Sequence, residues 1–300
     1  MVIIRELLKF LEEEKITFEF KGDINDVVDG FSSLSRYRAG TLTWCKELKN
    51  LPDDLSEKYR LIVMPSYYDN ISDNYIITDC GKRVFFSLIE AFFSNETKLP
   101  DVGVGTYISD RVKIGRNVKI GHNCVLDGDI ELGDNTIIYN NVSIINKVVI
   151  GKNCIVQSGA LIGQDDFSYT ENEEHRKKMI KHYGGVQIED DVLIGPGTII
   201  NRGTIDNTII GRGCKIDARC IISHNVILGE NSALIAGTIL YGSVKTGVNI
   251  YVATALVRNQ LHIGDNAVIG MGSVVVKDVD ANVTVAGVPA KKFEKVKKRG

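Results

Sequence analysis

An aliphatic residue recurs at every sixth position along the middle of the chain. The series begins at Val102, runs unbroken through eleven positions to Ile162, and resumes at Ile188. A period of six matches neither the 3.6-residue repeat of an amphipathic helix nor the two-residue alternation of a simple strand. It fits short strands joined by tight corners, with one large and one small side chain of each strand pointing inward. Such repeats stack into solenoids, because one repeat cannot bury its apolar face alone.

Three six-residue repeats make one triangular coil, so the pattern predicts a parallel β-helix. About 25 repeats at a strand spacing of about 4.8 Å give roughly eight coils and a rod about 40 Å long. We therefore predict a mainly β protein in which residues 99–278 form the β-helix. Four of the six cysteines occupy the small inward position and are expected to fill the core as reduced thiols. They are Cys124, Cys154, Cys214 and Cys220.

Residues 1–98 lack the period and read as a small α/β domain. Apolar residues lie on one helical face near the start, and residues 83–93 form an apolar helical pattern. Between them we expect strands within residues 16–20, 40–44, 60–64 and 74–78. Residues 279–300 form a C-terminal tail, whose basic residues are expected to be a solvated end, with contact to cofactor phosphates as the alternative. These residues are Lys291, Lys292, Lys295, Lys297, Lys298 and Arg299.

Composition excludes several classes of protein. The chain has 36 basic and 38 acidic residues, a formal net charge of -2, which argues against binding nucleic acid by bulk charge. The apolar runs are far shorter than the ~20 residues that span a bilayer, which argues against membrane insertion. Acidic residues interrupt the opening segment, so no secretory signal is expected and we predict a cytoplasmic location. No set of three histidines suited to zinc is evident, and no metal site is predicted.

Three segments interrupt the period: residues 163–187, 201–209 and 253–262. Counting repeats in threes puts the first two on one edge, in successive coils, next to the coil that carries His224. His224 lies two residues after an inward aliphatic, at an outward position near a corner. An exposed imidazole beside two loops suits a general base. A surface or subunit-interface histidine is the alternative.

Gly242 lies eighteen residues, or one coil, beyond His224. The missing side chain leaves room for a ligand, and the backbone N–H can face an oxyanion. The alternative is a corner glycine with a positive φ. Together the two residues predict acyl transfer, in which His224 accepts the proton of an attacking amine and Gly242 stabilises the tetrahedral intermediate.

The blocks "IGRNVKIGHNC" and "IGDNAVIGMGS" resemble those of left-handed β-helix acyltransferases. This resemblance implies a left-handed coil and a homotrimer with active sites between neighbouring rods. The segments "LIGQDDFSY", "IINRGTIDNTIIG" and "KIDARCIISHNVILG" are similar to those of UDP-3-O-acylglucosamine N-acyltransferases of the lipid A pathway, and "FSSLSRYRAGTLTWC" resembles their base-binding domain. The match implies that His224 is the base, Gly242 the oxyanion donor, and Trp44 a stacking partner for the nucleotide base. The other expected substrate-binding residues are Gln164, Asp165, Asn201, Arg202, Asp217 and Asn225.

The ending "LHIGDNAVIGMGSVVVKDVDANVTVAGVPAKKF" looks instead like that of sugar-nucleotide N-acetyltransferases, which use acetyl-CoA. The contacts to CoA that this implies are Asn259, Gly270, Pro289, Ala290 and Lys291. We therefore expect an N-acyltransferase (EC 2.3.1.-) without a tightly bound cofactor. It would move a short acyl group, acetyl being favoured, from acyl-CoA to the amine of a UDP- or dTDP-linked amino sugar.

Two other functions remain open from the sequence. The first is the lipid A enzyme itself, with a long hydroxyacyl chain carried on acyl carrier protein. That function requires a continuous apolar groove beside the catalytic residues. The second is a non-catalytic, ligand-binding β-helix, which predicts no turnover with any donor.

Overall fold

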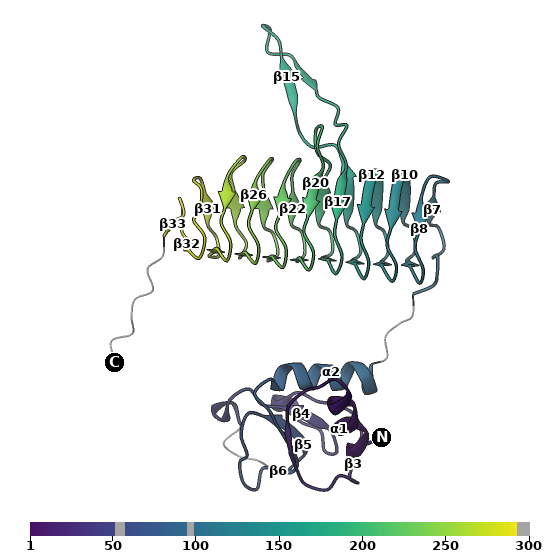
Figure 1. The fold of residues 1–300 in the computed structure, drawn as a ribbon, viewed down its shortest axis with the longest axis vertical. Coiled ribbons are helices and arrows are strands. Elements are labelled where there is room, and N and C mark those ends of the chain that lie inside the picture. The colour runs from purple at the N-terminus through teal and green to yellow at the C-terminus, as the bar shows by residue number, and fades with distance from the viewer. Residues whose placement is uncertain (52–57, 95–98, 293–300) are drawn as a thin grey trace. The chain divides into compact units, whose positions relative to one another are not determined.

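The computed structural model describes residues 1–51, 58–94 and 99–292, and the chain divides into two compact units, Met1–Thr97 and Lys98–Gly300 (Figure 1). None of the helices in the described ranges has the length and apolar character needed to cross a bilayer.

The first unit is the expected small α/β fold. Helix α1 (Ile4–Glu13) buries Ile4, Leu7, Leu8 and Leu11. With α2 (Gly81–Phe93) it packs on a four-stranded sheet in the order β2-β6-β5-β4. The strands are β2 (Glu19–Lys21), β4 (Leu42–Trp44), β5 (Tyr59–Met64) and β6 (Ser72–Ile77), and a separate pair is β1 (Val2–Ile3) with β3 (Val27–Val28). The short 3-10 helices are η1 (Leu34–Arg36) and η2 (Leu48–Asn50).

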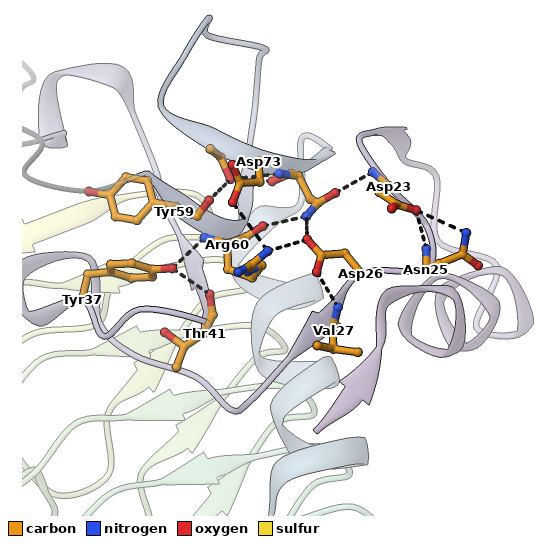
Figure 2. A network of polar contacts seen from close by, with 11 residues as sticks. Asp23, Asn25, Asp26, Val27, Tyr37, Thr41, Tyr59, Arg60 and Asp73 are labelled. Atoms are coloured by element: carbon orange, nitrogen blue, oxygen red, sulfur yellow. Dashed lines mark hydrogen bonds and ion pairs between the residues drawn. The ribbon is translucent and has the colours of Figure 1, made fainter.

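A polar network ties the loop before β3 to the sheet (Figure 2). Arg60 Nη1 and Asn74 Nδ2 both donate to Asp26 Oδ2, at 2.8 and 2.9 Å. The Tyr37 hydroxyl accepts the Arg60 N–H at 2.6 Å. Burial alone would raise the pKa of Asp26, but the hydrogen bonds from Arg60, Val27 and Asn74 hold that pKa below its ordinary value.

The second unit is a three-sided solenoid of short parallel strands (Figure 1). One face is a ten-stranded sheet of which nine strands are parallel, one coil more than the roughly eight expected. Its parallel strands are β9 (Lys119–Ile120), β11 (Ile137–Ile138), β13 (Ile155–Val156), β18 (Leu193–Ile194), β21 (Lys215–Ile216), β24 (Ala233–Leu234), β27 (Tyr251–Val252), β30 (Val268–Ile269) and β32 (Thr284–Ala286).

The other two faces share long strands that turn the corner between them, β10 (Val125–Leu132) and β12 (Ser143–Ile150). One of these faces continues with β7 (Tyr107–Ile108), β14 (Leu161–Gln164), β19 (Ile199–Asn201), β22 (Ile221–Ile222), β25 (Ile239–Leu240), β28 (Leu256–Val257) and β31 (Val274–Val275). The other continues with β8 (Lys113–Ile114), β17 (Val186–Ile188), β20 (Thr208–Ile210), β23 (Ile227–Leu228), β26 (Lys245–Thr246) and β29 (His262–Ile263).

The periodic aliphatic residues fill the interior of the solenoid, as the sequence predicts. Cys124, Cys154, Cys214 and Cys220 are fully buried among them. Burial raises the pKa of Cys154 and Cys214 to about 11, so both thiols are protonated at neutral pH. These cysteines are core residues, as expected.

The prediction of a third insertion at residues 253–262 is wrong. Val257 follows Val252 by five residues instead of six, and strand β28 pairs with β25 and β31 as a regular part of the coil. Thr254 has φ +43°, and this left-handed corner closes the coil with one residue fewer. The segment is therefore a shortened repeat, and it offers no loop to a neighbouring subunit.

The other two interruptions are real. The first carries the hairpin β15 (Tyr169–Glu171) and β16 (Lys177–Met179), which projects away from the coils (Figure 1). This hairpin is exposed, and its strands pair only with each other. The second interruption is a short loop between β19 and β20.

A hairpin closes the last coil. Strand β33 (Lys291–Lys292) runs antiparallel to β32, and the Ala290 N–H donates to the Val274 carbonyl at 2.8 Å. The hairpin covers the edge of β32 and leaves the short strand β33 at the edge of this sheet. Four of the basic residues of the predicted tail, Lys295, Lys297, Lys298 and Arg299, lie outside the described residues.

Candidate active site

His224 lies in the corner that follows β22 and is half-buried. Its Nδ1 is 3.1 Å from Asn225 Oδ1. The amide orientation of Asn225 is fixed, because its Nδ2 donates to the Asp206 carbonyl at 3.0 Å while its Oδ1 accepts the Thr204 N–H at 3.0 Å. Since an amide oxygen only accepts, Nδ1 carries the imidazole proton and Nε2 keeps a free lone pair. Asn225, expected to bind substrate, thus orients His224.

Gly242 lies directly against the His224 ring. A Cβ at this position would stand 2.4 Å from His224 Nε2 and 2.6 Å from Cε1. The space left by the missing side chain is therefore filled by the imidazole, whereas we had expected it to receive a ligand. Because Gly242 has no side chain, its backbone can lie directly against His224 Nε2.

The Gly242 N–H donates none of the hydrogen bonds found among the described residues. His224 and Val248 hold the position of Gly242 in other repeats, and there a carboxylate accepts the backbone N–H. Asp166 accepts the His224 N–H at 2.8 Å, and Asp265 accepts the Val248 N–H at 2.9 Å. The Gly242 N–H is thus a free donor beside Nε2, as an oxyanion site requires.

His182, which lies in the first interruption of the period, is a second histidine at the site. Its side chain is fully buried, and its ring centroid is 5.7 Å from that of His224, at an interplanar angle of 73°. His182 Nδ1 lies 3.2 Å from the Ile180 carbonyl, while Nε2 has no partner among the described residues. The two rings therefore pack edge to face.

Four predicted substrate residues gather at the root of the hairpin. Gln164 and Asn201 face each other across β14 and β19, beyond a shift in the strand register after Ile162. Arg202 Nε donates to Asp165 Oδ1 at 2.6 Å, and the His182 N–H donates to the other oxygen at 3.3 Å. Burial alone would raise the pKa of Asp165, but Arg202 and the His182 N–H hold that pKa below its ordinary value.

The remaining predicted residues lie away from the root of the hairpin, and one of them lines the pocket at His224. Asp217 caps a turn by accepting the N–H groups of Ala218 and Ala236, at 2.7 and 3.2 Å. Asn259 lines the same pocket as His224. The other expected CoA contacts do not line that pocket and belong to the last coils and the closing hairpin. They are Gly270, Pro289, Ala290 and Lys291.

A pocket of about 660 Å³ opens at His224 and Gly242. Its apolar wall is a stack of outward side chains at one register position of β22, β25, β28 and β31. These side chains are Ile221, Ile239, Leu256 and Val274. Three spacings of about 4.8 Å make a groove about 14 Å long. This is the apolar groove that a long acyl chain requires.

Trp44 belongs to the first unit, at the end of β4. It is half-buried, with its ring centroid 6.2 Å from that of Phe85. It lines a cavity of about 390 Å³ together with Lys46, Lys82 and Arg83. An aromatic face beside three cations suits a nucleotide base and its phosphates. Within the described ranges, no group of three His, Cys, Asp or Glu side chains could hold a metal ion.

Comparison with known proteins first identifies the fold class of the solenoid. The family "Bacterial transferase hexapeptide (six repeats)" matches residues 129–164, and "Hexapeptide repeat of succinyl-transferase" matches residues 111–146, 185–218, 207–241 and 261–277. Among solved structures, UDP-N-acetylglucosamine O-acyltransferase of Moraxella catarrhalis has a TM-score of 0.58 and 23% identity, over 65% of this chain and 74% of that one. The predicted fold, a left-handed parallel β-helix of hexapeptide repeats, is confirmed.

A narrower family follows from the curated relatives. UDP-3-O-acylglucosamine N-acyltransferase of Campylobacter lari is 35% identical over 306 aligned residues, 95% of this chain and 92% of the relative. The Wolinella succinogenes enzyme of the same name is 39% identical over 132 residues, 44% of this chain and 42% of that protein. In this second match, the aligned part spans less than half of the relative. The chain belongs to the UDP-3-O-acylglucosamine N-acyltransferase family.

This membership confirms the predicted enzyme class, an N-acyltransferase, and corrects the predicted reaction. The expected transfer of a short acyl group from acyl-CoA is wrong, since the Campylobacter lari relative, aligned over 95% of this chain, carries the name of the alternative, and so do relatives that match part of the chain. The physical reason lies in the C-terminal motif. Its Gly-Val-Pro-Ala turn builds the hairpin that closes the solenoid, so it reflects the fold and not the donor.

Proposed function

We propose that this chain transfers a long acyl chain from acyl carrier protein to the amine of a UDP-linked 3-O-acylglucosamine. The observation that carries the proposal is the pocket, in which the free Nε2 of His224 and the free N–H of Gly242 meet at an apolar groove. The relatives' names supply the acceptor. Acyl carrier protein is the donor that the resemblance to lipid A enzymes implies.

The two residues account for one balanced reaction. His224 Nε2 accepts a proton as the amine nitrogen attacks the thioester carbonyl carbon. The Gly242 N–H donates to the resulting oxyanion, an effect typically worth about 3 kcal/mol. When the intermediate collapses, the C–S bond breaks and His224 returns the proton to the leaving thiolate. Asn225 keeps Nδ1 protonated, so that Nε2 is the basic atom throughout.

The groove makes a prediction about acyl length. Ile239→Trp is expected to lower kcat/KM for a long-chain donor about 100-fold, because about four methylene groups lose burial worth ~0.8 kcal/mol each. A short-chain donor should be much less affected. The measurement is kcat/KM for both donors, with Lys245→Trp, an outward position on β26, as the matched control. Equal losses for the two donors would exclude the groove as the acyl site.

Trp44 is proposed to stack on the nucleotide base. As the only tryptophan of the chain, it reports binding directly. UDP is expected to quench its fluorescence, and Trp44→Ala should weaken UDP binding about tenfold, as stacking on a base contributes ~1–3 kcal/mol. Calorimetry that detects UDP binding with unchanged emission would contradict this role.

We also propose a homotrimer, the assembly that the family resemblance implies, with each pocket completed by a neighbouring rod. Sedimentation at micromolar concentration checks this, and a monomer there would be incompatible with it.

A further inference from the structure

Asp166 lines the pocket beside His224, and neither the sequence nor the mechanism above gives it a role. It lies in the loop after β14, where both carboxylate oxygens accept backbone N–H groups. Oδ1 accepts that of Phe167 at 2.7 Å, and Oδ2 accepts that of His224 at 2.8 Å. Two hydrogen bonds from separate segments hold the carboxylate in a fixed place next to the basic residue.

The charge of Asp166 is not neutralised by a side chain. The neighbouring Asp165 is paired with Arg202 at 2.6 Å, whereas Asp166 takes part in none of the ion pairs among the described residues. Besides Asp166 itself, the pocket lining contains one charged side chain, Arg258. A carboxylate that accepts hydrogen bonds only from backbone N–H groups can still accept further hydrogen bonds from a ligand.

We propose that Asp166 binds the ammonium group of the acceptor and selects an amine over a hydroxyl. This inference rests on the proposed function and names its specificity residue. Primary amines are mostly protonated near pH 7, and a hydrogen bond between charged partners is stronger than one between neutral groups. The bound ammonium releases one proton to solvent before its lone pair attacks, and the second proton passes to His224 Nε2.

The test compares two ligands that differ in charge only at the sugar nitrogen, UDP-glucosamine with an ammonium group and UDP-N-acetylglucosamine with an uncharged acetamide. Asp166→Asn, measured by calorimetry at pH 7, is expected to bind the amine about five- to tenfold more weakly and the N-acetyl ligand as before. In turnover, KM for the amine acceptor should rise by the same factor with kcat nearly unchanged. The matched control is Asp265→Asn, because Asp265 also caps a backbone N–H but lies outside the pocket. It should change neither affinity.

Two results would overturn the inference. Equal weakening of both ligands would show that Asp166 only holds its loop, and unchanged affinity for the amine would show that its charge is not used. Both results come from binding, so they are separate from the proposed function, which fails if the wild-type chain turns over no donor. No binding of UDP-glucosamine by the wild-type chain would overturn the inference but not the proposed function, whose acceptor also carries a 3-O-acyl group.

Discussion

Replacing His224 by alanine is expected to lower kcat/KM about 1,000-fold, in the range that general-base catalysis contributes. Activity is lost because the variant lacks the basic atom Nε2. Asn225 leaves this atom unprotonated, and the free N–H of Gly242 lies beside it. The measurement is formation of the N-acylated product at saturating acyl carrier protein donor, followed by mass spectrometry.

The matched control is His122→Ala. His122 lies on a distant coil, outside the pocket, where its Nδ1 accepts the Val104 N–H at 2.9 Å. This variant should keep nearly full activity. If the His224 variant retained more than a tenth of the wild-type rate, a different group would be the base.

Gly242→Ala is expected to lower kcat/KM by about 100-fold or more. The new methyl group would stand 2.4 Å from His224 Nε2, well inside van der Waals contact, so the imidazole must turn away. The backbone of Gly242 lies outside the left-handed region, so alanine meets no intrinsic strain there. The variant therefore displaces the base while leaving the solenoid intact.

A double variant separates this effect from a general loss of stability. With His224→Ala in place the ring is gone, so Gly242→Ala should cost little further activity and little unfolding free energy. The comparison needs kcat/KM and the free energy of unfolding for the four proteins of the cycle. Additive losses would mean that the glycine acts independently of His224.

The sequence predicts the solenoid because a six-residue period has one structural solution, whatever residues occupy the corners. It places His224 and Gly242 on one edge because their separation is one full coil. It cannot detect a repeat of five residues, which depends on the corner conformation of Thr254. It also cannot place His182 or Asp166, because these residues lie in an insertion whose path the period does not constrain.

The acyl donor is a second property that could not be predicted correctly from the sequence. The C-terminal motif pointed to acetyl-CoA, yet in the structure these residues close the last coil. The groove that favours a long acyl chain is made of Ile221, Ile239, Leu256 and Val274, which are single outward residues of four separate coils. Their common face can be counted from the period, but whether the wall is open or covered depends on the insertions beside it.

The most direct test of the proposed reaction is turnover of UDP-3-O-acylglucosamine by the wild-type chain with two donors. A long-chain hydroxyacyl group on acyl carrier protein is compared with acetyl-CoA under the same conditions. We predict N-acylation from acyl carrier protein with kcat/KM at least 100-fold above that for acetyl-CoA, because only the long chain fills the groove. Equal or faster transfer from acetyl-CoA would contradict the proposed reaction.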